Sequence, residues 1–218
     1  MKQLISLILC ILMLAVVANA FAESKPSPNM YIVLVNKDNK LPDGWSEMIV
    51  LSHATNSLGE DFLVEAVALE HFNALREELL EKGIQIELDS TYRSLDEQQE
   101  IWDEWLIDPE KGPEYCEQYL AKVGYSEHHT GLAIDVFIIK PDGYVEREND
   151  EMIADAETFA TAHEVLAKYG FILRYPQGKE EITGYSYEPW HFRFVGESVA
   201  KEISERNLTL EEYLEQQK

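Results

Sequence analysis

Hydrophobic residues recur at helical spacing in two long stretches of the chain. Over 62–82, apolar side chains return every three or four positions, and Gly83 follows where a helix would end. Over 155–169 the same spacing recurs, and the stretch stops at Gly170. These two patterns predict the two main helices of the fold.

Two further helices are predicted from their first turns. Ser94 and Glu97 have the spacing of a capping box, in which each side chain bonds the backbone of the other residue. Thr209 and Glu212 repeat this spacing and predict a short final helix. For the helix after Ser94, we expect a buried side made of Ile101, Trp102, Trp105 and Leu106.

Short apolar or alternating runs predict the strands. Residues 132–139 are almost continuously apolar, and residues 84–88 alternate between apolar and polar. Further strand candidates lie at 31–35, 171–175 and 191–195. Because helices and strands are mixed without regular βαβ alternation, we predict an α+β fold. It would be a single domain in which a small mixed or antiparallel sheet is flanked by helices.

The first residues differ from the rest of the chain. Lys2 precedes an apolar run over 4–17, and small residues follow up to Ala20 and Ala22. This is the order of a secretory signal peptide, so we expect one over 1–22. The run is shorter than the roughly 20 residues of a membrane-spanning helix, which favours cleavage over the alternative of an uncleaved anchor. We therefore expect an extracytoplasmic protein with no stable membrane span.

The charge balance limits the possible partners. The chain has 41 acidic and 18 basic residues and a formal net charge of -23. This charge opposes binding to nucleic acid, which we do not expect as a partner. Once the signal peptide with Cys10 is removed, Cys116 remains alone, which excludes an intramolecular disulfide. The neighbouring Glu117 disfavours a thiolate, so we do not expect Cys116 to be a nucleophile.

Two polar clusters contain residues with candidate chemistry. In the first, the polar segment 126–130 leads into an apolar strand that contains Asp135. Such a carboxylate is costly to bury unless it is paired or bound to a metal. In the second, Glu188 and His191 lie three positions apart, and Pro189 allows Glu188 to occupy the turn before a strand. An aspartate that caps a turn or pairs with an arginine is the alternative for Asp135, and the E-x-x-H pattern alone is weak evidence.

Together, the clusters supply two imidazoles, one carboxylate ligand and one spare carboxylate. Two histidines and one aspartate leave one position of a tetrahedral zinc ion open, which is typical of a hydrolytic site. Glu188 is then the natural general base. Arg93, in the otherwise uncharged stretch 90–94, is suited to bind a carboxylate or stabilise an oxyanion. A plain salt bridge is the alternative for Arg93.

Three ordered motifs stand out along the chain. They are Tyr92-Arg93-Ser94 with Gln98, S-x-H-x-x-G-x-A-x-D at 126–135, and E-P-W-H-x-R-x-V-G at 188–196. Together they resemble the motifs of the VanY-type D-alanyl-D-alanine carboxypeptidases. The wider group of zinc peptidases includes the VanX dipeptidases and the L,D-carboxypeptidases. The resemblance implies a zinc carboxypeptidase domain over 60–213, with its zinc site in a cleft, preceded by a leader and N-terminal strand/loop region over 23–59.

The resemblance also implies roles for individual residues. They are His128, Asp135 and His191 as zinc ligands, Glu188 as general base, Arg93 at the substrate carbonyl or terminal carboxylate, and Ser126 and Gln98 lining the peptide cleft. One departure from the family pattern is His129, which stands where a non-ligating polar residue is usual. It is expected to contact substrate or to have no role.

The activity implied by the resemblance is removal of the C-terminal D-alanine from peptidoglycan stem peptides. Export agrees with this activity, because that substrate lies outside the cytoplasmic membrane. One alternative is an L,D-carboxypeptidase, which would act on tetrapeptide stems with the same catalytic residues. Another is a wall-peptide binding module without catalysis, which would be expected to lack Glu188 or a ligand. A third is an inert exported domain in which the clusters are buried polar networks.

Overall fold

The computed structural model describes residues 28–109 and 111–218, so the signal peptide expected over 1–22 lies outside the described residues. A five-stranded antiparallel sheet has the order β3-β4-β7-β6, and β5 pairs with the end of β4. A separate hairpin pairs β1 with β2. The strands are β1 (Leu51–Thr55), β2 (Asp61–Glu65), β3 (Gln85–Ser90), β4 (Ala133–Ile139), β5 (Val145–Glu146), β6 (Phe171–Leu173) and β7 (His191–Phe194).

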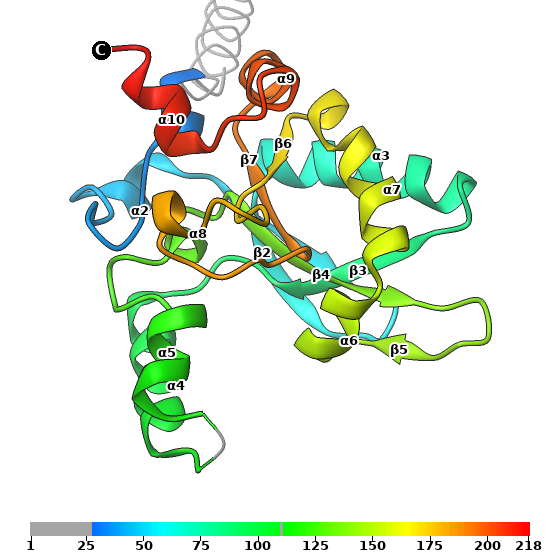
Figure 1. Ribbon diagram of the computed structural model, residues 1–218, viewed down its shortest axis with the longest axis horizontal. Coiled ribbons are helices and arrows are strands. Elements are labelled where there is room, and N and C mark those ends of the chain that lie inside the picture. Colours follow the sequence, from blue (N-terminus) through cyan, green and yellow to red (C-terminus); the bar gives the residue numbers. More distant parts are fainter. Residues whose placement is uncertain (1–27, 110) are drawn as a thin grey trace, which may run out of the picture.

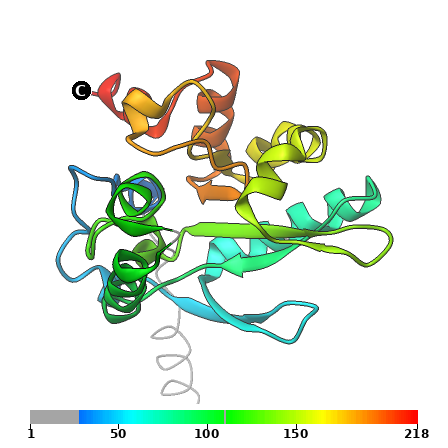
Figure 2. The ribbon, with the colours of Figure 1, turned by 60° about the horizontal axis from the view of Figure 1, so that its bottom comes forward.

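Helices cover the sheet and form two apolar clusters with it. The main core joins α3 (Ala66–Glu81) and α7 (Ala156–Leu166) to strands β3, β4, β6 and β7. A smaller cluster joins α9 (Glu197–Glu205) and α10 (Leu210–Glu215) to the neighbourhood of β6. Figure 2 shows these C-terminal helices and the β1–β2 hairpin on opposite sides of the sheet. The shorter helices are η1 (Pro28–Ile32), α2 (Trp45–Met48), η2 (Glu127–Thr130), α6 (Asn149–Ala154), η3 (Ala167–Tyr169) and α8 (Glu180–Thr183).

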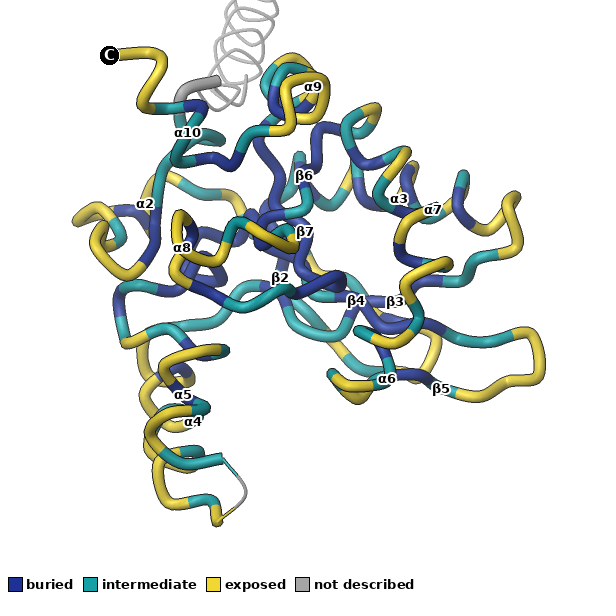
Figure 3. Tube along the Cα trace, viewed as in Figure 1, coloured by how far each residue is buried: buried dark blue, intermediate teal, exposed yellow. Residues whose placement is uncertain are grey.

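Helices α4 (Leu95–Ile107) and α5 (Gly112–Tyr119) form a hairpin that projects from the rest of the molecule (Figure 1). The burial predicted for one side of α4 is wrong, because Ile101, Trp102 and Trp105 are only partly buried and Leu106 is exposed (Figure 3). The projecting hairpin has no sheet on which to pack that side. Gln98 is the buried residue of α4.

The predicted fold class is confirmed: one α+β domain has an antiparallel sheet flanked by helices. Both capping boxes are present. Ser94 and Glu97 start α4, and Thr209 and Glu212 start α10, each through reciprocal side-chain to backbone hydrogen bonds. No helix among the described residues is long and apolar enough to cross a membrane.

The helix predicted over 62–82 begins later than its apolar spacing indicated. Residues 61–65 form β2, and α3 starts at Ala66. The reason is the buried carboxylate of Glu65, which accepts hydrogen bonds of 2.9 Å from the backbone N–H groups of Val67 and Ala68. This cap starts the helix and leaves the preceding residues to pair with β1.

The strand predicted over 31–35 does not form within the described part of the chain. The backbone makes the short 3-10 helix η1 and then an irregular segment. The carbonyl oxygens of Tyr31 and Val33 accept hydrogen bonds from Arg193 Nη2 at 3.1 and 2.8 Å. A buried side chain therefore satisfies these carbonyl groups in place of a neighbouring strand.

Candidate active site

A cavity of about 310 Å³ lies where η2 meets the sheet. Its walls contain six of the seven residues for which the sequence predicted a role: Arg93, Ser126, His128, Asp135, Glu188 and His191. The predicted residue Gln98 is not in the wall. Tyr175, Tyr185 and Trp190 add aromatic surface, and Ile101 and Trp105 of the projecting hairpin close one side. The half-exposed apolar side of α4 thus faces this cavity.

Strand register explains how distant residues meet there. Asp135 of β4 lies opposite His191 of β7, and Ser90 of β3 lies opposite Asp135 on the other side. His128 comes from η2, which Ser126 caps by accepting a hydrogen bond from the His128 backbone N–H at 3.3 Å. Gly131 then turns the chain into β4 with a φ of 72°. A Cβ at this glycine would also lie 3.0 Å from Leu51 Cδ2.

The partners of each histidine ring indicate which nitrogen faces the proposed metal position. His128 Nδ1 lies 2.7 Å from the carbonyl oxygen of Thr91, which only accepts, so Nδ1 donates its proton there. His191 has a carboxylate at each ring nitrogen, Glu127 at 3.5 Å from Nε2 and Asp135 at 2.9 Å from Nδ1, so a cation bound at Nδ1 would leave the ring proton on Nε2, facing Glu127. The other two ring nitrogens, His128 Nε2 and His191 Nδ1, both face Asp135.

This arrangement fits a metal ion. His128 Nε2 lies 3.2 Å from Asp135 Oδ2, and His191 Nδ1 lies 2.9 Å from Asp135 Oδ1. Acceptor atoms at these separations repel unless a proton or cation lies between them. One ligand atom from each of the three residues lies within 4.8 Å of the others. Two imidazoles and one carboxylate match the ligands of a zinc site with an open position.

Electrostatics within the group also favours a cation. Burial alone would lower the pKa of His191, but the carboxylates of Asp135 and Glu127 outweigh burial and raise this pKa to about 9. Burial alone would raise the pKa of Asp135, but His128 and His191 hold it well below its usual range. The Asp135 carboxylate therefore stays negatively charged between the two histidines. A cation bound there would take the place of the proton on His191.

Glu188 lies in the turn before β7, as the sequence predicted from Pro189. Its backbone N–H donates to the carbonyl oxygen of Tyr175 at 3.2 Å, and its own carbonyl oxygen accepts from the backbone N–H of His191 at 3.2 Å. Its Oε2 lies 3.6 Å from His191 Nδ1, beside the metal-binding group. Burial raises the pKa of Glu188 to about 8. The carboxyl group is thus suited to accept and return a proton near neutral pH.

Arg93 is fixed from behind with its guanidinium at the cavity wall. Nη2 donates to Ser90 Oγ at 2.7 Å, and Nη1 donates to Gln98 Oε1 at 3.0 Å. Gln98 is fully buried, and its amide nitrogen donates to the carbonyl oxygen of Ala121 at 2.7 Å. A substrate contact for Gln98 stays a prediction, because the contacts of its side chain in the structure are with Arg93 and Ala121.

His129 connects two backbone segments next to the site. Its Nε2 accepts from the backbone N–H of Gly124 at 3.1 Å, so Nδ1 carries the proton and donates to the carbonyl oxygen of Arg93 at 2.7 Å. Burial lowers the pKa of this imidazole, which keeps it neutral. His129 therefore positions the backbone of Arg93 and is not among the grouped ligand residues.

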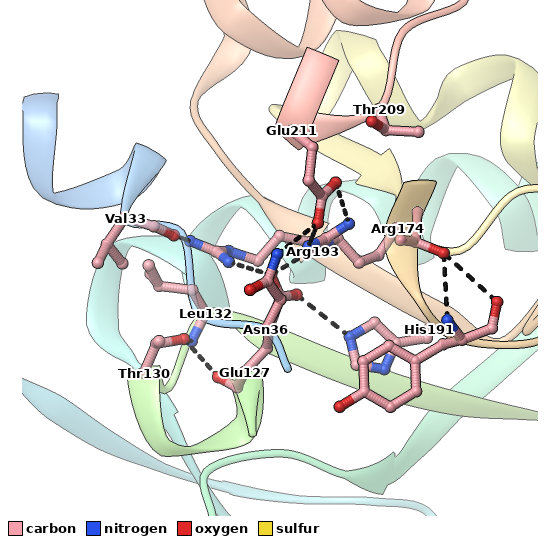
Figure 4. Close-up of polar contacts among 12 residues, drawn as sticks. Val33, Asn36, Glu127, Thr130, Leu132, Arg174, His191, Arg193, Thr209 and Glu211 are labelled. Atoms are coloured by element: carbon pink, nitrogen blue, oxygen red, sulfur yellow. Dashed lines mark hydrogen bonds and ion pairs between the residues drawn. The ribbon is translucent and has the colours of Figure 1, made fainter. Parts of the chain in front are cut away.

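Sequence reasoning missed a buried ionic network behind His191. Glu127, Arg174 and Arg193 are buried there and joined by hydrogen bonds, which continue to Glu211 of α10 (Figure 4). A usable signal was present, because Arg193 lies inside an apolar strand. The cost of burying an unpaired charge, which singled out Asp135, applies equally to Arg193.

Comparison with known proteins agrees with this geometry. The model of the VanY family, described as D-alanyl-D-alanine carboxypeptidase, matches residues 61–197. The chain belongs to this family. It is 39% identical to the bifunctional D-Ala-D-Ala dipeptidase and D-Ala-D-Ala carboxypeptidase VanXYC of Enterococcus gallinarum, over 83% of this chain and 91% of the relative. It is 36% identical to YodJ of Bacillus subtilis, over 90% of this chain and 71% of the relative.

Two solved carboxypeptidase structures share the fold. A VanY D,D-pentapeptidase in complex with Zn(II) matches with a TM-score of 0.69 and 30% identity, covering 85% of this chain and 99% of that chain. The L,D-carboxypeptidase LdcB matches with a TM-score of 0.69 and 34% identity, covering 86% of this chain and 87% of that chain. The chain thus belongs to a carboxypeptidase family, and its own His128, Asp135 and His191 form a donor set that fits zinc.

Proposed function

We propose that this VanY-family chain is an exported zinc carboxypeptidase that removes the C-terminal D-alanine from peptidoglycan stem peptides. The observation that carries the proposal is the meeting, in one cavity, of Glu188 and the Arg93 guanidinium with the group formed by His128, Asp135 and His191. These three residues would hold the zinc ion. When bound, zinc supplies a Lewis acid that polarises a carbonyl group and makes water more acidic.

In this proposal Glu188 is the general base. Its carboxylate accepts a proton from the attacking water as the water oxygen bonds to the scissile carbonyl carbon. It then donates that proton to the nitrogen of the departing D-alanine as the C–N bond breaks. The raised pKa of the buried Glu188 suits both directions of transfer.

Arg93 would orient the substrate. Its planar fork can bind the terminal carboxylate in a bidentate manner or donate to the oxygen of the scissile carbonyl. Ser90 and Gln98 hold the guanidinium in one orientation, so little side-chain entropy is lost when a ligand binds. Ser126, which lines the same cavity, is proposed as a further substrate contact.

Export is supported by the signal-peptide pattern of residues 1–22 and by the chemistry of the proposed substrate. Peptidoglycan lies outside the cytoplasmic membrane, so an enzyme that trims it must cross that membrane. The proposal keeps a leader and N-terminal region over 23–59 and a catalytic domain over 60–213.

An L,D-carboxypeptidase is the second candidate, because the chain is as similar in fold to LdcB as to the solved VanY enzyme. Both activities would use the same catalytic residues on stems of different length. A non-catalytic wall-peptide binding module has less support, because such a module has no use for a buried Glu188 beside the metal-binding group.

The test is release of free D-alanine by the zinc-loaded protein from a stem pentapeptide and a stem tetrapeptide, measured side by side. Activity on the pentapeptide supports the proposal, and activity on the tetrapeptide alone moves the chain to the L,D class. A chelator should abolish the activity, and added zinc should restore it. Zinc binding without release from either peptide would overturn the catalytic proposal and favour the binding module.

A further inference from the structure

The two histidines of the proposed metal site are supported in different ways. A neutral backbone carbonyl, that of Thr91, accepts from the outer nitrogen of His128. A buried carboxylate, that of Glu127, faces the outer nitrogen of His191 at 3.5 Å. Glu127 is also the residue immediately before His128 in η2. The same short helix thus contributes one proposed ligand and faces the other.

The two carboxylate oxygens of Glu127 have different neighbours. Oε1 accepts from Arg174 Nε at 2.7 Å and from Arg193 Nη1 at 2.6 Å (Figure 4). Oε2 has no conventional hydrogen-bond partner, and His191 Nε2, equally without one, lies in front of it. Because the two arginines fix the carboxylate through one oxygen, the other oxygen is held toward His191.

The two arginines are themselves fixed and electrically balanced. Arg174 makes two hydrogen bonds, of 2.7 and 2.9 Å, to the carboxylate of Glu211 on α10. Arg193 donates through Nη2 to the backbone carbonyl oxygens of Tyr31 and Val33. Two buried cations thus face two carboxylates, which balances the charge of the network and fixes the Glu127 carboxylate in place.

We propose that Glu127 is a positioning residue that fixes the ring of His191, with Nδ1 directed at the metal ion, and that Arg174 and Arg193 hold Glu127 for this purpose. The inference rests on the proposed metal site. A carboxylate on the outer nitrogen of a ligand histidine sets its tautomer and ring orientation and strengthens it as a ligand. If the network served only to stabilise the fold, Glu127 Oε2 would have no reason to face His191 without another hydrogen-bond partner.

The test compares the zinc affinity of the wild type with that of Glu127→Gln and Glu127→Asp, measured by competition with a chelator. Glutamine has nearly the same shape as glutamate but no negative charge to face His191. Aspartate keeps the negative charge, but its shorter side chain places the carboxylate farther from His191. Each variant should bind zinc about 10- to 100-fold more weakly. Glu87→Gln is the matched control, because Glu87 is also buried and paired with an arginine, at 3.1 Å from Arg76 Nη1. Its zinc affinity should equal that of the wild type.

Circular dichroism of each metal-free variant shows whether it is folded. If Glu127→Gln unfolds because two buried arginines lose their counterion, Glu127→Asp decides the question, since it retains that charge. A folded variant with wild-type zinc affinity would overturn the proposal.

Turnover separates this inference from the proposed function. In the Glu127 variants, saturating zinc should restore much of the turnover that is lost at limiting zinc. A variant that lacks the base Glu188 should stay inactive at every zinc concentration. If the wild type itself bound no zinc, the proposed function would fail, whereas equal zinc affinity of all variants would remove only the role of Glu127.

Discussion

At the scale of single residues, each proposed histidine ligand has one ring nitrogen that faces a supporting group and one that faces the proposed metal position. Thr91 and Glu127 occupy the outer nitrogens of His128 and His191, so the inner nitrogens face Asp135. His129 differs from them, because both of its ring nitrogens form hydrogen bonds with backbone groups. Its role is to hold the backbone beside the site.

We therefore predict that His129→Ala lowers kcat/KM about 10- to 100-fold while zinc content stays unchanged. The carbonyl oxygen of Arg93 and the N–H of Gly124 lose their partner, and a shift of about 1 Å in the Arg93 guanidinium is enough for such a loss. Steady-state kinetics and metal analysis of the purified variant check this. Loss of zinc at unchanged kcat/KM of the zinc-loaded protein would contradict the positioning role. His71→Ala on α3 is the control, with wild-type kinetics expected.

At the scale of elements, helix starts were the most predictable features. A capping box is local, because its two side chains and backbone groups lie within four residues. The pairs that begin at Ser94 and Thr209 could therefore be identified from sequence alone. The start of α3 could not, because the choice between strand and helix over 61–65 depends on pairing with β1. The exposure of α4 depends on the whole molecule, since apolar spacing does not reveal whether a partner surface exists.

The two capping boxes allow a prediction about the cavity wall. Ser94→Ala and Thr209→Ala should each lower the free energy of unfolding by about 1 kcal/mol, because each removes an N-cap acceptor. Only Ser94→Ala should also raise KM, since α4 carries Ile101 and Trp105 on the cavity wall. Urea denaturation and steady-state kinetics measure the two effects. An equal rise of KM in both variants would contradict this prediction, because α10 contributes no residue to the cavity wall.

At the scale of the whole molecule, the C-terminal helix is connected to the centre through charge. Glu211 of α10 contacts Arg174, which contacts Glu127 behind His191 (Figure 4). No local pattern could reveal this connection, because its members lie far apart in the sequence. The motifs that carry the proposed ligands and base were readable, since each keeps its spacing within ten residues. Their meeting in one cavity required the register of β3, β4 and β7.

This connection predicts a pH-dependent contribution to stability. Burial alone would raise the pKa of Glu211, but the guanidinium of Arg174 more than offsets burial, so the pKa is lowered. The ionised carboxylate therefore stabilises the fold above its unfolded pKa of about 4.3, and this contribution is lost as the pH falls through the folded pKa. Glu211→Gln should be less stable than the wild type by about 2 kcal/mol at pH 7.

Urea denaturation at pH 7, 5 and 3 checks this prediction. The difference between wild type and Glu211→Gln should shrink toward pH 3, because pH 3 lies below the unfolded pKa of about 4.3 and the preference of the folded state for the ionised carboxylate then declines. Glu215→Gln is the control on the same helix, because Glu215 is exposed and pairs with the exposed Lys218. It should show no such pH dependence. A difference for Glu211→Gln that stays constant from pH 7 to 3 would contradict the charge connection.

The central claim is that His128, Asp135 and His191 hold a zinc ion beside a separate general base, Glu188. The most direct measurement is the zinc content of Glu188→Gln together with its rate of D-alanine release from a stem peptide. We predict one zinc ion per chain, as in the wild type, with turnover lowered about 100- to 10,000-fold. A variant that keeps wild-type turnover, or that loses its zinc together with its activity, would contradict it.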